Sequence, residues 1–76
     1  MPHVEIKCYP GRTEEQKLMC AEEVTAAIVK TMGCEASSVS VAIKEINKED
    51  WKNEVWDPQI IAESDALYRK PGYTCE

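Results

Sequence analysis

Two stretches of alternating apolar and polar residues, separated by a segment long enough for one helix, most limit how this chain can fold. A period of two is typical of a β-strand. Strands are therefore expected at residues 2–8 and 39–46. Their apolar members are Val4, Ile6 and Cys8 in the first strand and Val39, Val41 and Ile43 in the second. Strand, helix and strand in this order predict a βαβ unit, whose crossover is right-handed and whose strands are parallel.

The segment between the two strands carries the signals of one long helix. Thr13 is followed three residues later by Gln16, which is the spacing of a capping box. Apolar residues then recur close to helical spacing as far as Met32, and Gly33 is well placed to end the helix.

A second helix is expected nearer the C-terminal end. Asp57 followed by Pro58 is typical of an N-cap and a first helical residue. This helix is predicted to run to about Arg69, which leaves residues 47–56 as a polar connection.

The whole chain, 1–76, is expected to form a single domain of the α/β (α+β) class. A chain of this size buries only about 60% of its unfolded surface, so a monomer would be marginally stable. Two paired strands also leave backbone groups unmet at their outer edges. A second copy would complete a four-stranded sheet with both long helices on one face, and we therefore expect a symmetric homodimer.

Composition argues against several classes of partner. Acidic residues outnumber basic ones by 14 to 9, a net charge of −5, which does not favour binding to nucleic acid. No apolar run reaches the roughly 18 residues of a spanning helix and no signal peptide is recognisable, so we expect no membrane partner and a cytoplasmic location. The four cysteines and single histidine lack the spacing of a metal site. We expect no metal or cofactor, and we interpret the cysteines as reduced thiols in preference to a redox sensor or a disulfide scaffold.

Pro2 is the first candidate for chemistry. Proline cannot donate to a sheet ladder but is tolerated at the first residue of a strand, so a purely structural explanation exists. If Met1 is removed, however, the Pro2 nitrogen becomes a free secondary amine. A nearby cation or burial in an apolar pocket would favour its neutral form, which a general base requires.

Arg12 and Trp51 are the next candidates. Arg12 lies in the loop before the long helix and could hold a carboxylate through two hydrogen bonds, or could be a solvated loop residue. Trp51 stands in a polar stretch, where it could form a dry pocket wall or anchor a core or an interface. His3 fits a position on the strand surface better than the role of a base. The sequence contains neither a nucleophile elbow nor a glycine-rich phosphate loop.

Taken in order, these residues resemble the 4-oxalocrotonate tautomerase family of the tautomerase superfamily. The resemblance covers about residues 2–52 and is carried by Pro2, Gly11, Arg12, the helix start at 13–17 and the strand residues 38–41. Further similarity, to a longer phenylpyruvate-tautomerase-like bacterial branch, is carried by Trp51 and by segments 55–57 and 69–73.

The resemblance implies a βαβ fold and a cofactor-independent enol–keto tautomerase. It implies that Pro2, after removal of Met1, acts as general base and then acid on a 2-hydroxydienoate or a phenylenolpyruvate-type 2-oxo acid. It also implies that Arg12 binds substrate and that Trp51 forms an aromatic pocket wall. Hexameric members carry a second arginine where this chain has Ser40. We expect Ser40 to offer the substrate one hydrogen bond but no charge, which favours a monocarboxylate with an aromatic body.

Other assemblies and functions stay open at this point. The longer branch tends to be dimeric and the shorter proteins form hexamers as trimers of dimers, so a homodimer is expected and a hexamer is the alternative. Hydration or dehalogenation of an unsaturated acid would need a residue that activates water, such as Glu5, Glu54 or Asp57. A non-catalytic dimeric binding protein is the remaining reading, if the Pro2 nitrogen stays blocked.

Overall fold

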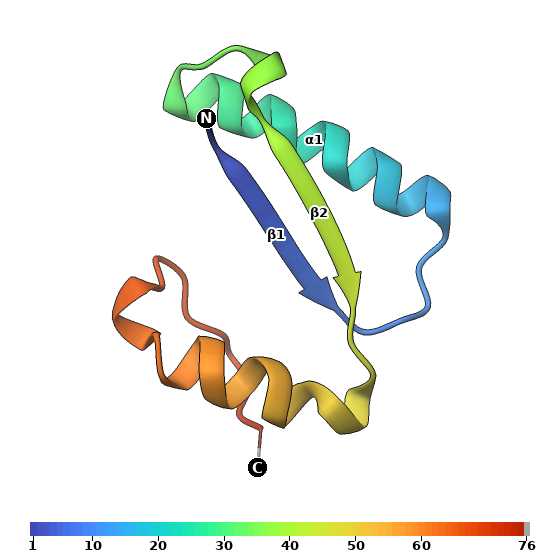
Figure 1. Ribbon diagram of the computed structural model, residues 1–76, viewed down its shortest axis with the longest axis vertical. Coiled ribbons are helices and arrows are strands. Elements are labelled where there is room, and N and C mark those ends of the chain that lie inside the picture. The colour runs from blue at the N-terminus through green and yellow to red at the C-terminus, as the bar shows by residue number, and fades with distance from the viewer. Residues whose placement is uncertain (76) are drawn as a thin grey trace. The chain divides into compact units, whose positions relative to one another are not determined.

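Two parallel strands, β1 (His3–Cys8) and β2 (Ser40–Glu45), pair along their full length in the computed structural model, which describes residues 1–75. Figure 1 shows them side by side, with the chain crossing between them through a long helix. The register sets His3 opposite Ser40 and Cys8 opposite Glu45. Both strands were predicted to within one residue at each end, and the predicted βαβ order is confirmed.

The crossover helix α1 (Glu14–Met32) begins and ends where local signals place it. The Thr13 hydroxyl accepts a hydrogen bond from the Gln16 amide at 3.1 Å, and the Gln16 side chain accepts one from the Thr13 amide at 2.8 Å. The predicted capping box is therefore formed. Gly33 ends the helix with φ of 70°, a left-handed conformation that glycine adopts without a steric cost.

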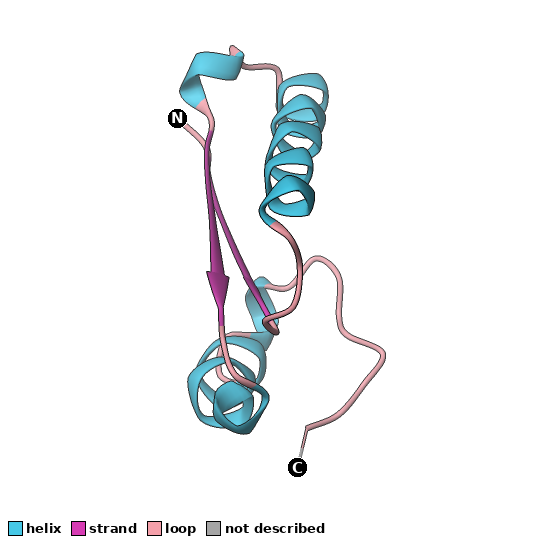
Figure 2. Ribbon diagram, turned by 90° about the vertical axis from the view of Figure 1, so that its right-hand side faces the viewer, coloured by secondary structure: helices cyan, strands magenta, loops and turns pink. Residues whose placement is uncertain are grey.

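Helix α1 lies against only one face of the strand pair (Figure 2). This apolar face of the sheet consists of Val4, Ile6, Cys8, Val41 and Ile43. Lys17 ties the helix to the sheet, because its ammonium group lies 3.1 Å from the Glu14 carboxylate and 3.3 Å from that of Glu45. The hydrogen bond to Glu14 is the main reason that the pKa of Lys17 is raised.

The apolar layer between α1 and the strands is thin. None of the helix residues is fully buried, and the side chains of Leu18 and Met19 stay 65% and 62% exposed. Within residues 1–45, the apolar face of the strands is only half-buried as well. The residues of this unit, Met1–Glu45, thus do not by themselves cover all of its apolar surface.

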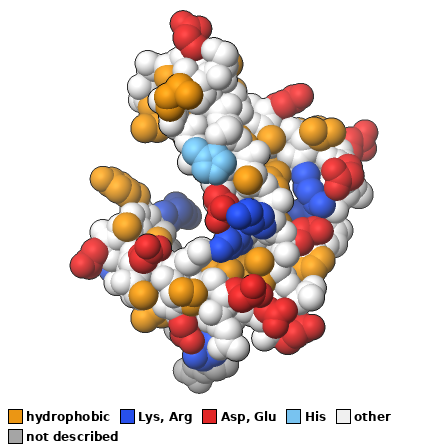
Figure 3. Space-filling view, in the orientation of Figure 1, with side chains coloured by type: hydrophobic (Ala, Val, Ile, Leu, Met, Phe, Trp, Pro, Cys, Tyr) orange, Lys and Arg blue, Asp and Glu red, His pale blue; other side chains and the backbone are white. Residues whose placement is uncertain are grey.

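The opposite, polar face of the strand pair carries charged side chains (Figure 3). The Glu5 carboxylate lies 2.8 Å from the Lys44 ammonium group and 3.6 Å from that of Lys7. The hydrogen bond and charge of Lys44, supported by Lys7, lower the pKa of Glu5 below its usual value of 4.5. Cross-strand pairing of opposite charges therefore organises this face.

The residues from 46 onward form a second unit. A short 3₁₀ turn, η2 (Lys48–Asp50), leads to Trp51 and then to the helix η3 (Lys52–Ile61), which has π-helical hydrogen bonding. A further 3₁₀ turn, η4 (Ser64–Ala66), follows, and η1 (Ala36–Ser38) is a similar turn just before β2. Val55 and Trp56 form the core here, with 5% and 9% of their surfaces exposed.

The predicted helix from Asp57 to about Arg69 is wrong in position, and most of residues 47–56, predicted as a polar connection, are helical. The helix starts five residues earlier, at Lys52, and contains Pro58 in its interior. Burial of Val55 and Trp56 explains the difference, because tertiary packing overrides a local capping signal. The wide π-helical turn accommodates the proline, and within it the Ala62 amide donates to the Asp57 carbonyl at 3.0 Å. The Asp57 carboxylate forms an ion pair with the Lys52 ammonium group at 2.8 Å.

Candidate active site

Pro2 stands directly before β1, and the sheet fixes its position. Its carbonyl accepts a hydrogen bond from the Ser40 amide at 3.2 Å, which extends the strand ladder by one residue. The proline ring is half-buried, whereas Met1 is fully exposed. Because proline has no amide proton, the ladder loses no donor at this position.

Ser40 joins Pro2 at this end of the strand pair, together with His3. The Nδ1 atom of His3 lies 2.6 Å from the Ser40 hydroxyl oxygen, so a short hydrogen bond links the two side chains on the polar face of the sheet. Both groups are solvent-exposed. His3 lies on the strand surface, as predicted, but its pairing with Ser40 was not predicted. The exact register of the two strands was the missing information, since a shift of one residue would move Ser40 to the other face.

Arg12 lies at the other end of β1. It is an exposed residue of the loop before α1, and its Nη1 atom donates to the Tyr9 carbonyl at 3.3 Å. The six residues of β1, about 20 Å of extended chain, lie between Pro2 and this loop. A single copy of the chain therefore brings Pro2 and Ser40 together but leaves Arg12 far from both.

Trp51 belongs to the second unit, between η2 and η3, and is half-buried. Its indole nitrogen donates a hydrogen bond to the Tyr73 hydroxyl at 3.2 Å. The Tyr73 ring in turn lies 5.3 Å, centre to centre, from the ring of buried Trp56. Trp51 thus belongs to an aromatic cluster with Tyr73 and Trp56.

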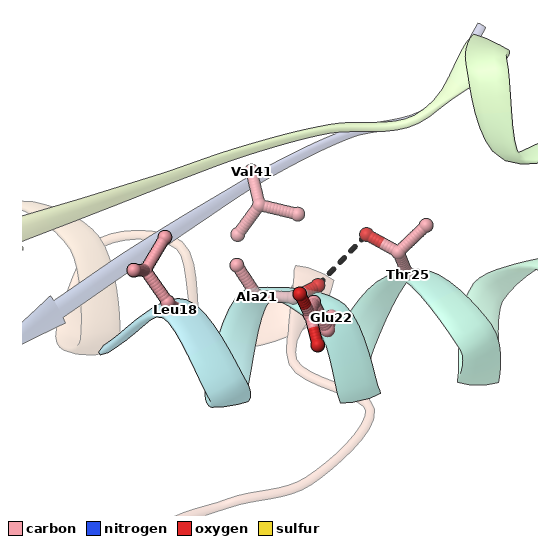
Figure 4. A pocket seen from close by; sticks show the side chains of 5 residues that line it. All are labelled: Leu18, Ala21, Glu22, Thr25 and Val41. Carbon is pink, nitrogen blue, oxygen red and sulfur yellow. Dashed lines mark hydrogen bonds between the residues drawn. The ribbon is translucent and has the colours of Figure 1, made fainter. Parts of the chain in front are cut away.

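An open pocket of about 350 Å³ lies between α1 and β2 (Figure 4), and none of the predicted site residues lines it. It is lined by Leu18, Ala21, Glu22, Thr25 and Val41. The Thr25 hydroxyl donates to the Ala21 carbonyl at 2.8 Å, so it already has a partner within the helix. This mainly apolar hollow marks incomplete coverage of the sheet and offers no set of reactive groups.

The four cysteines are present as free thiols. In the described part of the chain, no group of three or more histidine, cysteine or acidic side chains is arranged to hold a metal ion. Nor does any helix of residues 1–75 have the length and apolar character needed to cross a membrane.

Comparison with known proteins places this geometry in a family. The family model described as "Tautomerase enzyme" matches residues 2–55. Tautomerase PptA of Cronobacter sakazakii is 47% identical over 74 residues, which span 96% of this chain and 97% of that protein. Tautomerase PptA of Escherichia coli K12 is 39% identical over 75 residues, with coverage of 97% and 96%.

Solved structures show the same fold. YwhB, a homologue of 4-oxalocrotonate tautomerase, superimposes with a TM-score of 0.60 at 40% identity, covering 62% of this chain and 77% of its own. A 4-oxalocrotonate tautomerase isozyme of Methylibium petroleiphilum gives a TM-score of 0.63 at 40% identity, covering 66% and 81%. The chain with Pro2 at the head of its parallel βαβ unit therefore belongs to the tautomerase family and is an isomerase with the fold of the 4-oxalocrotonate tautomerases.

Proposed function

We propose that this protein interconverts the enol and keto forms of a small 2-oxo acid, with Pro2 as the proton-transferring group after Met1 is removed. The observation that carries the proposal is the placement of Pro2, whose backbone is held by the Ser40 amide at the head of β1 while Met1 stays exposed. An exposed first residue is open to an aminopeptidase. Its removal would leave the secondary amine on a ring that the sheet already positions.

The chemistry needs only one proton to move. The neutral Pro2 amine would take the proton from the enol hydroxyl of the substrate, and the resulting ammonium would return it to the neighbouring carbon, C3. No electrons are exchanged with a second molecule, so the reaction requires no cofactor. An ordinary terminal amine has a pKa near 7.7–8.0, and a water-poor pocket with a nearby cation would bring more of it into the neutral form.

We propose that Arg12 holds the substrate carboxylate from a neighbouring copy of the chain. Pro2 and Arg12 lie at opposite ends of β1, so a pocket that contains both is incomplete without a second protomer. Two features support such an assembly: in residues 1–75 the outer edges of the two strands have no strand partner, and Leu18 and Met19 of α1 are exposed. A homodimer is the smallest assembly that meets this need, and a hexamer built from dimers is the alternative.

A phenylenolpyruvate-type monocarboxylate is the substrate class that we favour. The exposed pair of Ser40 and His3 beside Pro2 offers hydrogen bonds where a second arginine would offer a permanent charge. Trp51 would supply an aromatic wall for the body of such a substrate. We also place the protein in the cytoplasm, where its four free cysteines would stay reduced.

The decisive experiment compares three forms of the protein in a phenylenolpyruvate ketonisation assay. The first is the natural chain, shown by intact mass to begin at Pro2. The second is Pro2→Ala, and the third carries a non-cleavable extension before Pro2, which turns the amine into an amide and leaves every side chain in place. We expect activity only in the first form. Equal activity in all three would refute Pro2 as the base.

A further inference from the structure

Two tryptophans near η3, Trp51 and Trp56, both contact Tyr73, which follows them in the C-terminal tail. The Tyr73 hydroxyl accepts the hydrogen bond of the Trp51 indole at 3.2 Å, across 22 positions of sequence. Its ring lies 5.3 Å from that of Trp56 at an angle of 40°, which is within the range of favourable tilted aromatic pairs. Tyr73 therefore has one attachment at each end of its side chain.

The two attachments differ in how firmly they are held. Trp56 is only 9% exposed and is part of the core of this unit, whereas Tyr73 is 47% exposed. The buried Trp56 ring can fix the Tyr73 ring, and the Tyr73 hydroxyl then presents an acceptor in a set place. An indole that donates to a fixed acceptor loses rotational freedom before any substrate arrives, and this lowers the entropic cost of binding.

We propose that Tyr73 is a positioning residue for Trp51, so that the C-terminal tail sets how well the aromatic wall receives substrate. The inference rests on the proposed function, because Trp51 must line the substrate pocket for its orientation to matter. Tyr73 itself takes no part in moving the proton. Loss of its hydroxyl therefore weakens substrate binding and leaves the rate of the bound complex nearly unchanged.

The test is Tyr73→Phe, which removes the hydroxyl and keeps the ring that packs on Trp56. One neutral hydrogen bond contributes about 0.5–1.5 kcal/mol, so we expect the KM for phenylenolpyruvate to rise about two- to tenfold. The kcat should stay within about twofold, because Pro2 and its surroundings are untouched. In the NMR spectrum, the indole N–H resonance of Trp51, assigned by its absence in Trp51→Phe, should move upfield as its acceptor is lost.

Matched variants separate positioning from a general loss of structure. Tyr68 is fully exposed, so Tyr68→Phe removes an equivalent hydroxyl and should leave both KM and the indole resonance unchanged. In a Trp51→Phe background there is no indole donor, and adding Tyr73→Phe should then have no further effect on KM. An additional loss of the same size in that background would overturn the inference.

The remaining outcomes are also decisive. In one outcome, Tyr73→Phe moves the indole resonance but leaves KM unchanged, while Trp51→Phe raises KM. The hydrogen bond would then exist without positioning the wall, and the inference would fail. If Trp51→Ala, which removes the ring itself, leaves KM unchanged, Trp51 is not a wall and the inference fails. Neither result bears on Pro2, whose role is decided separately by the blocked and Pro2→Ala proteins.

Discussion

The His3 ring nitrogen Nδ1 lies 2.6 Å from the Ser40 hydroxyl, across the parallel strands and next to Pro2. His3 and Ser40 are opposite each other in the strand register. The Ser40 amide also donates a hydrogen bond to the carbonyl of Pro2, the residue before His3. The proposed base is thus bonded through its carbonyl to Ser40, whose side chain pairs with that of His3.

This pair gives a prediction on substrate binding. His3→Ala and Ser40→Ala should each raise the KM for phenylenolpyruvate about two- to tenfold, the effect expected from one neutral hydrogen bond. Because both changes break the same bond, the double variant should be little worse than either single one. If the fold-increase in KM of the double variant equals the product of the two single fold-increases, the residues act independently.

Separation of Pro2 and Arg12 along β1 predicts complementation between defective chains. Pro2→Ala should be nearly inactive, and Arg12→Ala should lose about tenfold or more in kcat/KM through the lost charged hydrogen bonds. In a dimer whose pocket takes one residue from each copy, co-expression of the two variants restores one intact site per mixed dimer. Random pairing should then recover about a quarter of the natural activity.

The control for this experiment is Arg69→Ala, which removes an exposed arginine of the second unit. It should behave like the natural chain, alone and in mixtures. Absence of any recovery from co-expressed Pro2→Ala and Arg12→Ala, in mixed dimers isolated by two affinity tags, would show that Arg12 does not complete the site of another copy.

The capping box at the start of α1 predicts a measurable loss of stability. Thr13→Ala removes the acceptor of the Gln16 amide and should lower the free energy of unfolding by about 1 kcal/mol. Thr31→Ala is the matched control, because the Thr31 hydroxyl bonds only back to the Ala27 carbonyl inside the same helix at 2.7 Å. Urea unfolding at equal protein concentration measures both, and equal midpoints for the two variants would contradict the capping role.

The pH dependence of the polar face follows from Glu5. Lys44 and Lys7 lower the pKa of Glu5 below 4.5, so its ion pairs stabilise the fold above that pH and the stabilisation is lost as the pH falls below it. Glu5→Gln should therefore melt a few degrees lower than the natural chain near pH 7, and the gap should close in acid. Glu23→Gln, at an exposed position of α1, should show no such gap. A gap that widens in acid would reverse the assigned sign.

Local signals were sufficient for the first 45 residues. The alternation in β1 and β2 and the capping box of Thr13 and Gln16 act over a few residues, so composition and spacing alone located these elements. At Asp57 and Pro58 local signals were misleading, because this apparent helix start lies inside a helix that already began at Lys52. Burial of Val55 and Trp56 outweighs the local preference there.

The sequence by itself determined the order of strand, helix and strand, the family and the candidate residues, because each depends on residue type and short spacing. Only the tertiary structure decided which of those residues meet. It joins Ser40 to Pro2 and His3, sets Arg12 at the far end of the strand, and attaches Trp51 to Tyr73. Such pairings depend on strand register and on the packing of residues tens of positions apart, and no local pattern of side chains encodes either one.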